Sequence, residues 1–491
     1  MTAPIRLDLV WPRLESIADE VAANLVKTAF SHDVVECRDM AVAVCDERGR
    51  LLAHSHLGAT GHIGSVPGFM RELLRRFPSE RITDGDAFAC NDPWIASGHT
   101  PDVFVACPLF VGGRLSGFVV SAVHHADIGG RAGAGDVSEV YEEGLLLPIV
   151  RLQTGYEEAS DVLAIVRRNV RFGDHVIGDF RAQIAARRTG LARLATLLAE
   201  QSLETLSGVG DEIIARTEKA MRASILKLGV GRYQASCDLD TVNVDGAPLR
   251  IVLTLSIRPD GTLEADFAGT SPQVRRPINC PIQYALAYAV VATKLACRAD
   301  VPTNEGAYRA IRVVAPEGSL LNPTYPAPVF WRLSTGLLVA ELILRCIDAA
   351  DGQRVPAESG SLPVWQFYVT GTRSDGTPFS LHQHGFGGMG ARPRRDGLDS
   401  ISFPYNVRDV SVEGSELETP ILIKRRELRE GSGGAGQFRG GLGETIVLCA
   451  APSGDLHPLL PLVLSGGAGR VGAGPAGADG GEAGAPGRIS A

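Results

Sequence analysis

Histidine and aspartate side chains gather in one part of this sequence, between residues 91 and 130. Asn91-Asp92-Pro93-Trp94 comes first, Gly98-His99-Thr100-Pro101-Asp102 follows, and His124-His125-Ala126-Asp127 comes near the end of the stretch. Imidazole and carboxylate groups are ligands of divalent first-row metals. These residues could therefore hold such an ion, provided that the fold brings them together.

The two segments between these polar residues predict a β-hairpin. Residues 103–111 and 115–123 are almost entirely apolar, as is typical of strands buried on both faces. Gly112-Gly113 between them suits a tight two-residue turn, where a positive φ is needed. The hairpin would bring four candidate ligands to one end of one sheet: His99, Asp102, His124 and Asp127.

The register of this hairpin decides whether the candidate ligands share a face. Counting outward from the glycine pair puts Pro101 opposite His124 and Asp102 opposite Val123. A regular pleat then sends Asp102 to the face opposite from His99 and His124. The cluster forms only if the pleat begins after Asp102, which the bend at Pro101 allows. The alternative is that these are ordinary polar residues at the mouth of a hairpin.

Further histidines lie outside this stretch. His54, His56 and His62 fall in a glycine-rich segment that we expect to be a loop, with a helix beginning at Gly68. Loop histidines of this kind more often bond to backbone or substrate than to a metal. His382-Gln383-His384 follows a predicted strand and could also reach a metal, although we rank it behind the first cluster.

The composition limits the possible functions. The chain has 491 residues, 45% hydrophobic and 21% charged, as in a globular enzyme of several domains. A net charge of -8 without a basic block argues against a nucleic-acid or membrane partner. The sequence shows no transmembrane run, and Met1–Pro12 does not resemble a signal peptide. Nine cysteines scattered singly indicate a reducing cytoplasm.

Alternating helical and extended patterns predict an α+β, multi-domain chain with mixed and antiparallel sheets and flanking helices. The glycine-rich stretch 432–443 lacks the Lys-Ser/Thr pair of a phosphate-binding loop, so we expect no nucleotide site in this chain. The expected regions are an N-terminal α/β region with the metal site (1–155), a helical segment (156–230), an α/β middle region (231–350), a β-rich C-terminal region (351–465) and a flexible Gly/Ala-rich tail (466–491).

Several short motifs follow one another along nearly the whole chain. They are Arg13-Leu14-Glu15-Ser16-Ile17-Ala18, Thr28-Ala29-Phe30-Ser31, Asn91-Asp92-Pro93, residues 99–103 and 124–130, Glu142-Glu143-Gly144-Leu145, Pro302-Thr303-Asn304-Glu305-Gly306, Ala315-Pro316-Glu317-Gly318-Ser319 and residues 432–443. With these motifs in this order, the chain resembles the hydantoinase B/oxoprolinase family. Members are the smaller type of subunit in ATP-dependent hydantoinases, oxoprolinases, caprolactamases, and acetone or acetophenone carboxylases.

The resemblance implies a metal site and a partner. It implies a divalent metal (Zn, Mn or Fe) bound by His99, Asp102 and His124, with Asp39 as the fourth ligand. It also implies a hydantoinase A-type subunit that binds ATP, and hence a hetero-oligomer. Our candidate catalytic residues are His125 and Asp127, and our candidates for contact with substrate or with the ligands are Asn91, Asp92, His54, His62 and Glu143.

The resemblance further implies a cyclic amide hydrolase acting on hydantoins, oxoproline or lactams. The partner would phosphorylate the carbonyl oxygen of the substrate, and this chain would supply a metal-activated water as the nucleophile. The alternative in the same family is a ketone carboxylase. Two histidines and one carboxylate are also the ligands of non-haem iron oxygenases, and a scaffold subunit without metal is the non-enzymatic alternative.

The sequence departs from the family pattern at two places. Cys37 stands in Glu36-Cys37-Arg38-Asp39 where the family has an arginine, and Trp94 with Ala96-Ser97 replaces an aromatic and glycine pair. The proposed ligands are retained. Loop shape and substrate preference are therefore the properties that we expect to differ.

Overall fold

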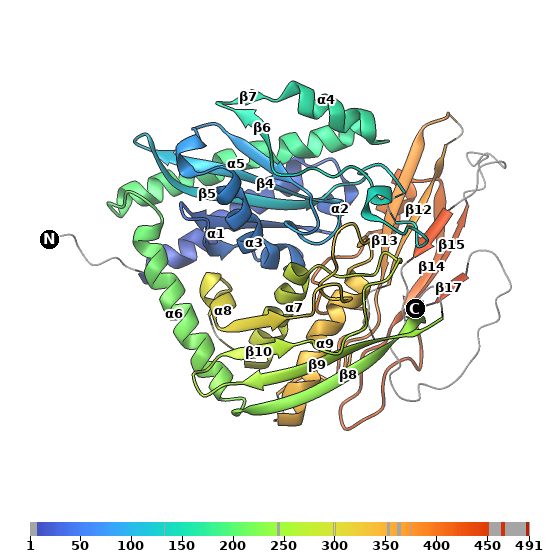
Figure 1. Ribbon diagram of the computed structural model, residues 1–491. Coiled ribbons are helices and arrows are strands. Elements are labelled where there is room, and N and C mark those ends of the chain that lie inside the picture. Colours follow the sequence, from blue (N-terminus) through green and yellow to red (C-terminus); the bar gives the residue numbers. More distant parts are fainter. Residues whose placement is uncertain are drawn as a thin grey trace.

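The computed structural model describes residues 7–131, 133–242, 246–297, 299, 301–350, 354–360, 365–373, 375–450, 463–466 and 488–490. As predicted, the fold is α+β and multi-domain, with antiparallel and mixed sheets and flanking helices. Figure 1 shows the N-terminal part (blue to cyan), the middle part (green and yellow) beside it, and the C-terminal strands (orange and red) at one end.

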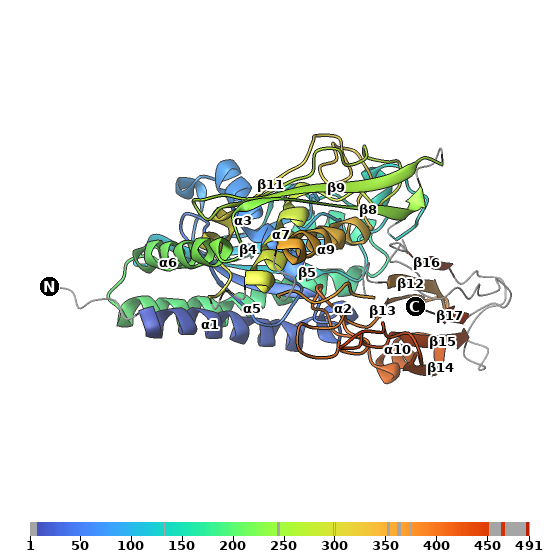
Figure 2. The same cartoon turned by 90° about the horizontal axis from the view of Figure 1, so that it is seen from below.

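A seven-stranded antiparallel sheet carries the candidate ligands, with the strand order β2-β1-β5-β4-β3-β6-β7. Its strands are β1 (Met40–Asp46), β2 (Leu51–His54), β3 (Ala87–Cys90), β4 (Asp102–Val111), β5 (Arg114–His124), β6 (Val150–Thr154) and β7 (Glu157–Glu158). Helices α1 (Leu7–Thr28) and α5 (Gly173–Glu200) cover one face and lie side by side below it in Figure 2. Helix α3 (Thr60–Arg76) covers the other face. Because both faces are covered, the central strands are apolar throughout.

The predicted β4–β5 hairpin is present, but its register differs by one residue from the simple count. Val111 pairs with Arg114 as expected, and a bulge near Leu109 then shifts the pairing so that Asp102 lies opposite His124. Ser116 is the extra residue, and its hydroxyl donates to the backbone carbonyl of Glu204. Residues directly opposite each other on paired strands share a face. The bulge therefore removes the parity conflict between Asp102 and His124.

The glycine-rich segment around His62 is a helix and not the expected loop. Helix α3 begins at Thr60, so it includes His62 and extends eight residues before the start predicted at Gly68. A Cβ on Gly64 would lie 2.0 Å from the Cβ of Ala287, which belongs to the neighbouring helix α7 (Ile282–Cys297). The glycines thus permit close helix packing, and the expectation of a loop was wrong because it treated them as breakers.

The middle part is a mixed sheet with helices packed on it. Its strand order is β11-β10-β9-β8, and β10 and β11 are parallel. The strands are β8 (Gly231–Val242), β9 (Pro248–Ile257), β10 (Leu263–Asp266) and β11 (Ile311–Val314). The apolar core lies between this sheet and helices α6 (Ser207–Leu226), α7, α8 (Glu305–Arg309) and α9 (Leu333–Ala350).

The C-terminal part consists mainly of two three-stranded sheets. In one sheet the strands follow the order β13 (Pro378–Gly385), β12 (Trp365–Thr372) and β16 (Val463–Gly466). In the other sheet the order is β14 (Ile421–Leu428), β15 (Glu444–Ala450) and β17 (Arg488–Ser490). The remaining helices are α2 (His32–Val35), α4 (Ser160–Asn169) and α10 (Val412–Glu418), with short 3-10 turns at Ser79–Arg81 and Val140–Glu143.

Most of the Gly/Ala-rich tail, residues 466–491, lies outside the described residues, and its described positions are the strand residues Gly466 and Arg488–Ser490. None of the helices in the described part of the chain combines the length and the apolar character that crossing a bilayer requires.

Candidate metal centre

Three of the predicted ligands meet at the end of the β4–β5 hairpin. Asp102 opens β4, His124 ends β5, and His99 lies in the turn before β4. His124 Nδ1 lies 3.0 Å and His99 Nε2 2.8 Å from the same carboxylate oxygen, Asp102 Oδ1. All three side chains are buried, and they offer ligand atoms within 4.8 Å of one another. The structure therefore brings His99, Asp102 and His124 together.

Asp39 and His62 extend this cluster. Asp39 immediately precedes β1. Its backbone carbonyl accepts a hydrogen bond from His124 N, and its side-chain Oδ2 lies 3.9 Å from His124 Nδ1. His62 reaches across from α3, with Nε2 2.9 Å from Asp39 Oδ1 and Nδ1 3.4 Å from Asp102 Oδ2. Tyr405, from the C-terminal part of the chain, donates to Asp39 Oδ2 at 2.8 Å. His62 thus lies between the two carboxylates.

A buried arginine that the sequence analysis missed also contacts the cluster. Arg332, just before α9, is 2% exposed, and its Nη2 lies 2.6 Å from Asp102 Oδ2. The guanidinium also donates to the carbonyl of Ser97 and lies 4.2 Å from the ring centroid of Tyr284. Arg332 therefore anchors Asp102 Oδ2, and Oδ1 faces His99 and His124.

A second group of side chains reaches the centre from the C-terminal sheet. His382 Nδ1 lies 2.7 Å from Asp33 Oδ1, and the His382 ring stacks on Tyr368 at a centroid distance of 4.3 Å. The Tyr368 hydroxyl lies 3.0 Å from His124 Nε2. Ligand atoms of Asp33, His124 and His382 again fall within 4.8 Å of one another. His384 lies beside His382 and contacts the side chain of Gln366.

The surroundings shift the pKa values of His99 and His124 in opposite directions. Burial, followed by the charge of Arg332, lowers the pKa of His99 to about 3, so its imidazole is neutral at pH 7. Burial would also lower the pKa of His124. The hydrogen bond to Asp102 and the surrounding carboxylates outweigh that effect and raise the pKa of His124 to about 9.

The carboxyl groups remain ionised despite their burial. Burial alone would raise the pKa of Asp39, but the hydrogen bond and charge of His62 hold this pKa below its usual range. The pKa of Asp102 is likewise held well below its usual range, because the charges of His62 and Arg332 and the hydrogen bond with His124 together outweigh burial. Both side chains therefore present anionic oxygens to the centre.

The charge and the donors of the centre fit a divalent cation. The carboxylates of Asp33, Asp39 and Asp102 face one permanent cation, Arg332, and all four residues are buried. With neutral imidazoles, as metal ligands must be, two negative charges are in excess, which a divalent cation would balance. Without an ion, a proton on His124 offsets part of this buried charge. His99 Nε2 is buried beside the carboxylate without the geometry of a hydrogen bond. Imidazole and carboxylate donors with this charge suit Zn, Mn or Fe.

Three other predicted residues point away from the cluster. His125 lies on the opposite face of the sheet, packs its ring on Phe180 of α5 at 4.8 Å, and contacts Gln183. Asp127 forms an ion pair with Arg171 at 2.9 Å. His54 Nδ1 lies 2.8 Å from the backbone carbonyl of Ser55.

Asn91 and Asp92 hold the backbone around the centre. The Asn91 amide donates to the carbonyl of Thr100 at 2.7 Å, and its oxygen accepts from Leu147 N at 2.6 Å. Asp92 Oδ1 accepts from Trp94 N at 3.0 Å. These side chains fix the loops that carry His99 and contact none of the proposed ligands through a described hydrogen bond.

Glu143 connects the backbone of two loops beside His99. Its Oε1 accepts hydrogen bonds from the backbone of Val329 at 2.7 Å and of Phe330 at 2.9 Å, while His99 Nδ1 lies 3.1 Å from the Phe330 carbonyl. Burial raises the pKa of Glu143 to about 8. A carbonyl acceptor on one ring nitrogen orients an imidazole and leaves the other nitrogen free to bind a metal.

Comparison with known proteins assigns this fold and sequence to one group. A family model described as hydantoinase B/oxoprolinase matches residues 3–491. The chain is 31% identical over 457 residues to a protein assigned as the B-type chain of a D-/L-hydantoinase in Pseudomonas sp. (strain NS671), covering 90% of this chain and 77% of that protein.

Two solved structures have closely similar folds. The crystal structure of an ATP-dependent caprolactamase from Pseudomonas jessenii matches with a TM-score of 0.81 and 26% identity, covering 91% of this chain and 78% of that chain. An acetone carboxylase in its nucleotide-free form also gives a TM-score of 0.81, covering 91% of this chain and 62% of that chain. At 19% identity, the second likeness concerns the fold alone.

Proposed function

The chain belongs to the hydantoinase B/oxoprolinase family, and from this premise we propose that it is the metal-binding subunit of an ATP-dependent cyclic amide hydrolase. Its substrate would be a small cyclic amide whose carbonyl oxygen is phosphorylated by a hydantoinase A-type partner that binds ATP. The observation that supports this proposal most strongly is the cluster of His99, Asp102 and His124, buried with an excess of carboxylate charge.

The proposed ligands are Asp39, His99, Asp102 and His124. A divalent ion held by them would supply Lewis-acid activation of a water molecule near neutral pH. The chain's own residues prepare this site in two ways. The Phe330 carbonyl orients His99, and Glu143 fixes Phe330 through its backbone N–H. The Tyr368 hydroxyl orients His124 from its Nε2 side.

Arg332 and His62 would keep the carboxylates in place. Arg332 binds Asp102 Oδ2, so that Oδ1 faces His99 and His124. His62 lies between the carboxylates of Asp39 and Asp102. The closed, water-poor surroundings strengthen these electrostatic interactions. Phosphorylation of the carbonyl oxygen makes the amide carbon a better electrophile, so the remaining requirement on this chain is a well-positioned nucleophile.

Elemental analysis of the purified chain tests the metal assignment. We expect about one equivalent of a transition metal in the wild type and its loss in a His99→Ala/His124→Ala variant. His56→Ala is a matched control, because His56 is exposed and pairs with Asp19 instead of the cluster. Wild-type protein that takes up no metal when reconstituted with the ATP-binding partner would refute the assignment.

Product analysis of the reconstituted complex tests the reaction. Ring opening of a hydantoin or lactam that requires ATP, and that is lost in the His99→Ala/His124→Ala variant, would support the hydrolase. ATP hydrolysis that depends on bicarbonate would instead support a ketone carboxylase. Activity that survives the loss of both histidines would mean that the chain acts as a scaffold.

A further inference from the structure

The proposed reaction requires a place for phosphate. ATP would transfer one phosphoryl group to each substrate molecule, so hydrolysis must release one inorganic phosphate for each ring that opens. Proteins bind a phosphate dianion best with guanidinium groups, which donate hydrogen bonds to its oxygens and balance its charge. Arginines whose charge is not already taken up by a carboxylate are therefore the candidates for such a site.

Two arginines that bond to the hairpin region are already engaged. Arg332 is buried and binds Asp102 Oδ2 at 2.6 Å. Arg171 donates to the backbone carbonyl of Gly130 and pairs with Asp127 at 2.9 Å. Each of these guanidinium charges is thus balanced by an aspartate.

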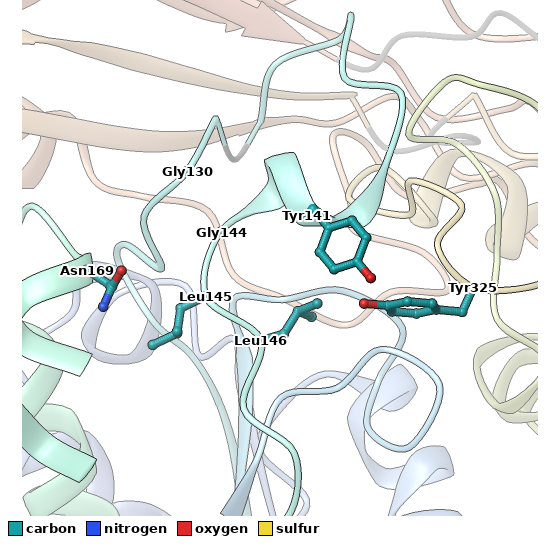
Figure 3. Close-up of a pocket in the computed structure, with 7 residues that line it drawn as sticks. All are labelled: Gly130, Tyr141, Gly144, Leu145, Leu146, Asn169 and Tyr325. Atoms are coloured by element: carbon teal, nitrogen blue, oxygen red, sulfur yellow. The ribbon is translucent and has the colours of Figure 1, made fainter. Parts of the chain in front are cut away.

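A surface pocket of about 430 Å³ borders Gly130 (Figure 3). The rings of Tyr141 and Tyr325 lie at one end of it, and the side chain of Leu145 lines its wall. None of the described residues that line the pocket carries a charge. Arg171 reaches Gly130, but Asp127 already balances its charge. The pocket therefore offers phosphate no free cation from its described lining.

Arg38 and Arg408 differ from these arginines, because they lie on adjoining segments and lack an acidic partner. The backbone N–H of Arg408 donates to the carbonyl of Cys37 at 2.7 Å. Burial and then the charge of Arg408 lower the pKa of Arg38, as expected for a like charge nearby. Within the described part of the chain, neither guanidinium forms a hydrogen bond or an ion pair, and Arg38 Nη1 is buried. We call these two residues the arginine pair.

The backbone of Arg38 has an unfavourable conformation. Its φ is +59°, in the left-handed region that favours glycine. Backbone hydrogen bonds from Asp39 N to the Asp33 carbonyl, at 2.9 Å, and from Met40 N to the Arg38 carbonyl, at 2.8 Å, hold this turn. The strain, the repulsion between the two guanidiniums and the unpartnered buried nitrogen all act against the fold. An anion bound between the guanidiniums would offset the last two.

Both members of the arginine pair are close in sequence to residues of the candidate metal centre. Arg38 directly precedes Asp39, a proposed ligand, and Arg408 follows shortly after Tyr405. The Tyr405 hydroxyl donates to Asp39 Oδ2 at 2.8 Å. An anion held by both arginines would therefore connect the two segments that meet at Asp39.

We propose that the arginine pair binds a phosphate dianion, and that in the complex this anion is the inorganic phosphate released from the activated substrate. The binding of phosphate follows from the arginine pair alone. The source of the phosphate rests on the proposed function. Two planar guanidiniums can donate to different oxygens of one tetrahedral phosphate, so the ligand fits the donors in charge and in geometry.

Calorimetric titration of the full chain with inorganic phosphate tests the site. A chelator first removes metal, so that phosphate on a metal ion does not contribute, and chloride keeps the ionic strength constant. We expect one saturable site per chain, with the Kd raised about tenfold in Arg38→Gly and in Arg408→Gln, since each loses one charge-assisted contact. Arg168→Gln, which removes an exposed arginine of α4, is the matched control and should bind as the wild type does.

The Arg38→Gly variant has a second readout. Glycine adopts a φ of +59° without strain, so this variant should unfold in phosphate-free buffer at the Tm of the wild type or above it. Added phosphate should raise the Tm of the wild type and not that of the variant. A wild type without a saturable site, or a Kd that is unchanged in both Arg38→Gly and Arg408→Gln, would refute the site.

Kinetics of the reconstituted complex identify the source of the phosphate. Added phosphate should inhibit ring opening by the wild type, and about tenfold more weakly with Arg408→Gln, in line with the loss of affinity. Inhibition that is absent, or equal in both, would refute the assignment to released phosphate and leave the site standing. A complex that opens no ring, although its chain binds phosphate, would refute the proposed function and not the site.

Discussion

Replacing Asp102 by asparagine tests how the buried charges of the centre are balanced. Asp102 is fully buried, and its Oδ2 lies 2.6 Å from Arg332, which is 2% exposed. Asparagine preserves the size of the side chain and removes its charge. The guanidinium of Arg332 would then be buried beside a neutral amide.

The expected loss of stability follows from the partners that Arg332 retains. Removing one member of a buried ion pair destabilises a protein by about 3–5 kcal/mol, because the other charge is left uncompensated. Arg332 keeps its hydrogen bond to Ser97 and its place over Tyr284. Relief of repulsion between Asp102 and Asp39 is small, since His62 lies between them. We therefore expect a loss near the lower limit, about 3 kcal/mol.

Urea unfolding in the presence of a chelator measures this loss without a contribution from metal binding. The Arg332→Met/Asp102→Asn double variant should recover most of the loss, because it removes both members of the buried pair and strands neither of them. Asp136→Asn is the control: it breaks an exposed pair with Arg131 and should leave the transition unchanged. A single variant as stable as the wild type, or a double variant no better than the single one, would refute this account of the charges.

Three further changes have defined outcomes. Burial raises the pKa of Glu143 from 4.5 to about 8, so the folded state keeps a proton that the unfolded chain releases, and stability should fall as pH rises through this range. Glu143→Gln should remove that fall and gain a few kcal/mol at pH 8, as measured by urea unfolding from pH 5 to pH 9. Gly64→Ala should destabilise the fold by about 1–3 kcal/mol in the same assay, because its Cβ would lie 2.0 Å from the Cβ of Ala287; unchanged stability would contradict the close packing. Tyr368→Phe should weaken metal binding about tenfold in a chelator competition, since His124 loses its hydroxyl partner.

The sequence contains enough information to predict the elements that carry the centre. The apolar runs 103–111 and 115–123 and the glycine pair between them define the β4–β5 hairpin, and the structure contains it. The one-residue shift was not predictable from the local pattern, and its extra residue, Ser116, bonds to Glu204, a residue far along the chain. Local patterns predict strands, whereas long-range hydrogen bonds decide their register.

The position of His125 could have been inferred more accurately. Successive residues of a strand point to opposite faces, so if His124 faces the centre, His125 faces away from it. The structure places His125 against Phe180 of α5. For His62 the local pattern is misleading, because glycines that permit close helix packing resemble glycines of a loop until the neighbouring helix is known.

The remaining parts of the centre depend on the complete fold. Arg332 contacts Asp102 across 230 residues of sequence, and His382 contacts Asp33 across 349. No periodicity links such pairs, so the sequence of this chain alone offers no signal for them. These long separations along the sequence have a physical consequence. The hairpin by itself presents two histidines and an aspartate, but the guanidinium that fixes Asp102 and the tyrosine hydroxyl that fixes His124 come from other parts of the chain. The preorganisation of the candidate centre is therefore a property of the N-terminal, middle and C-terminal parts acting together.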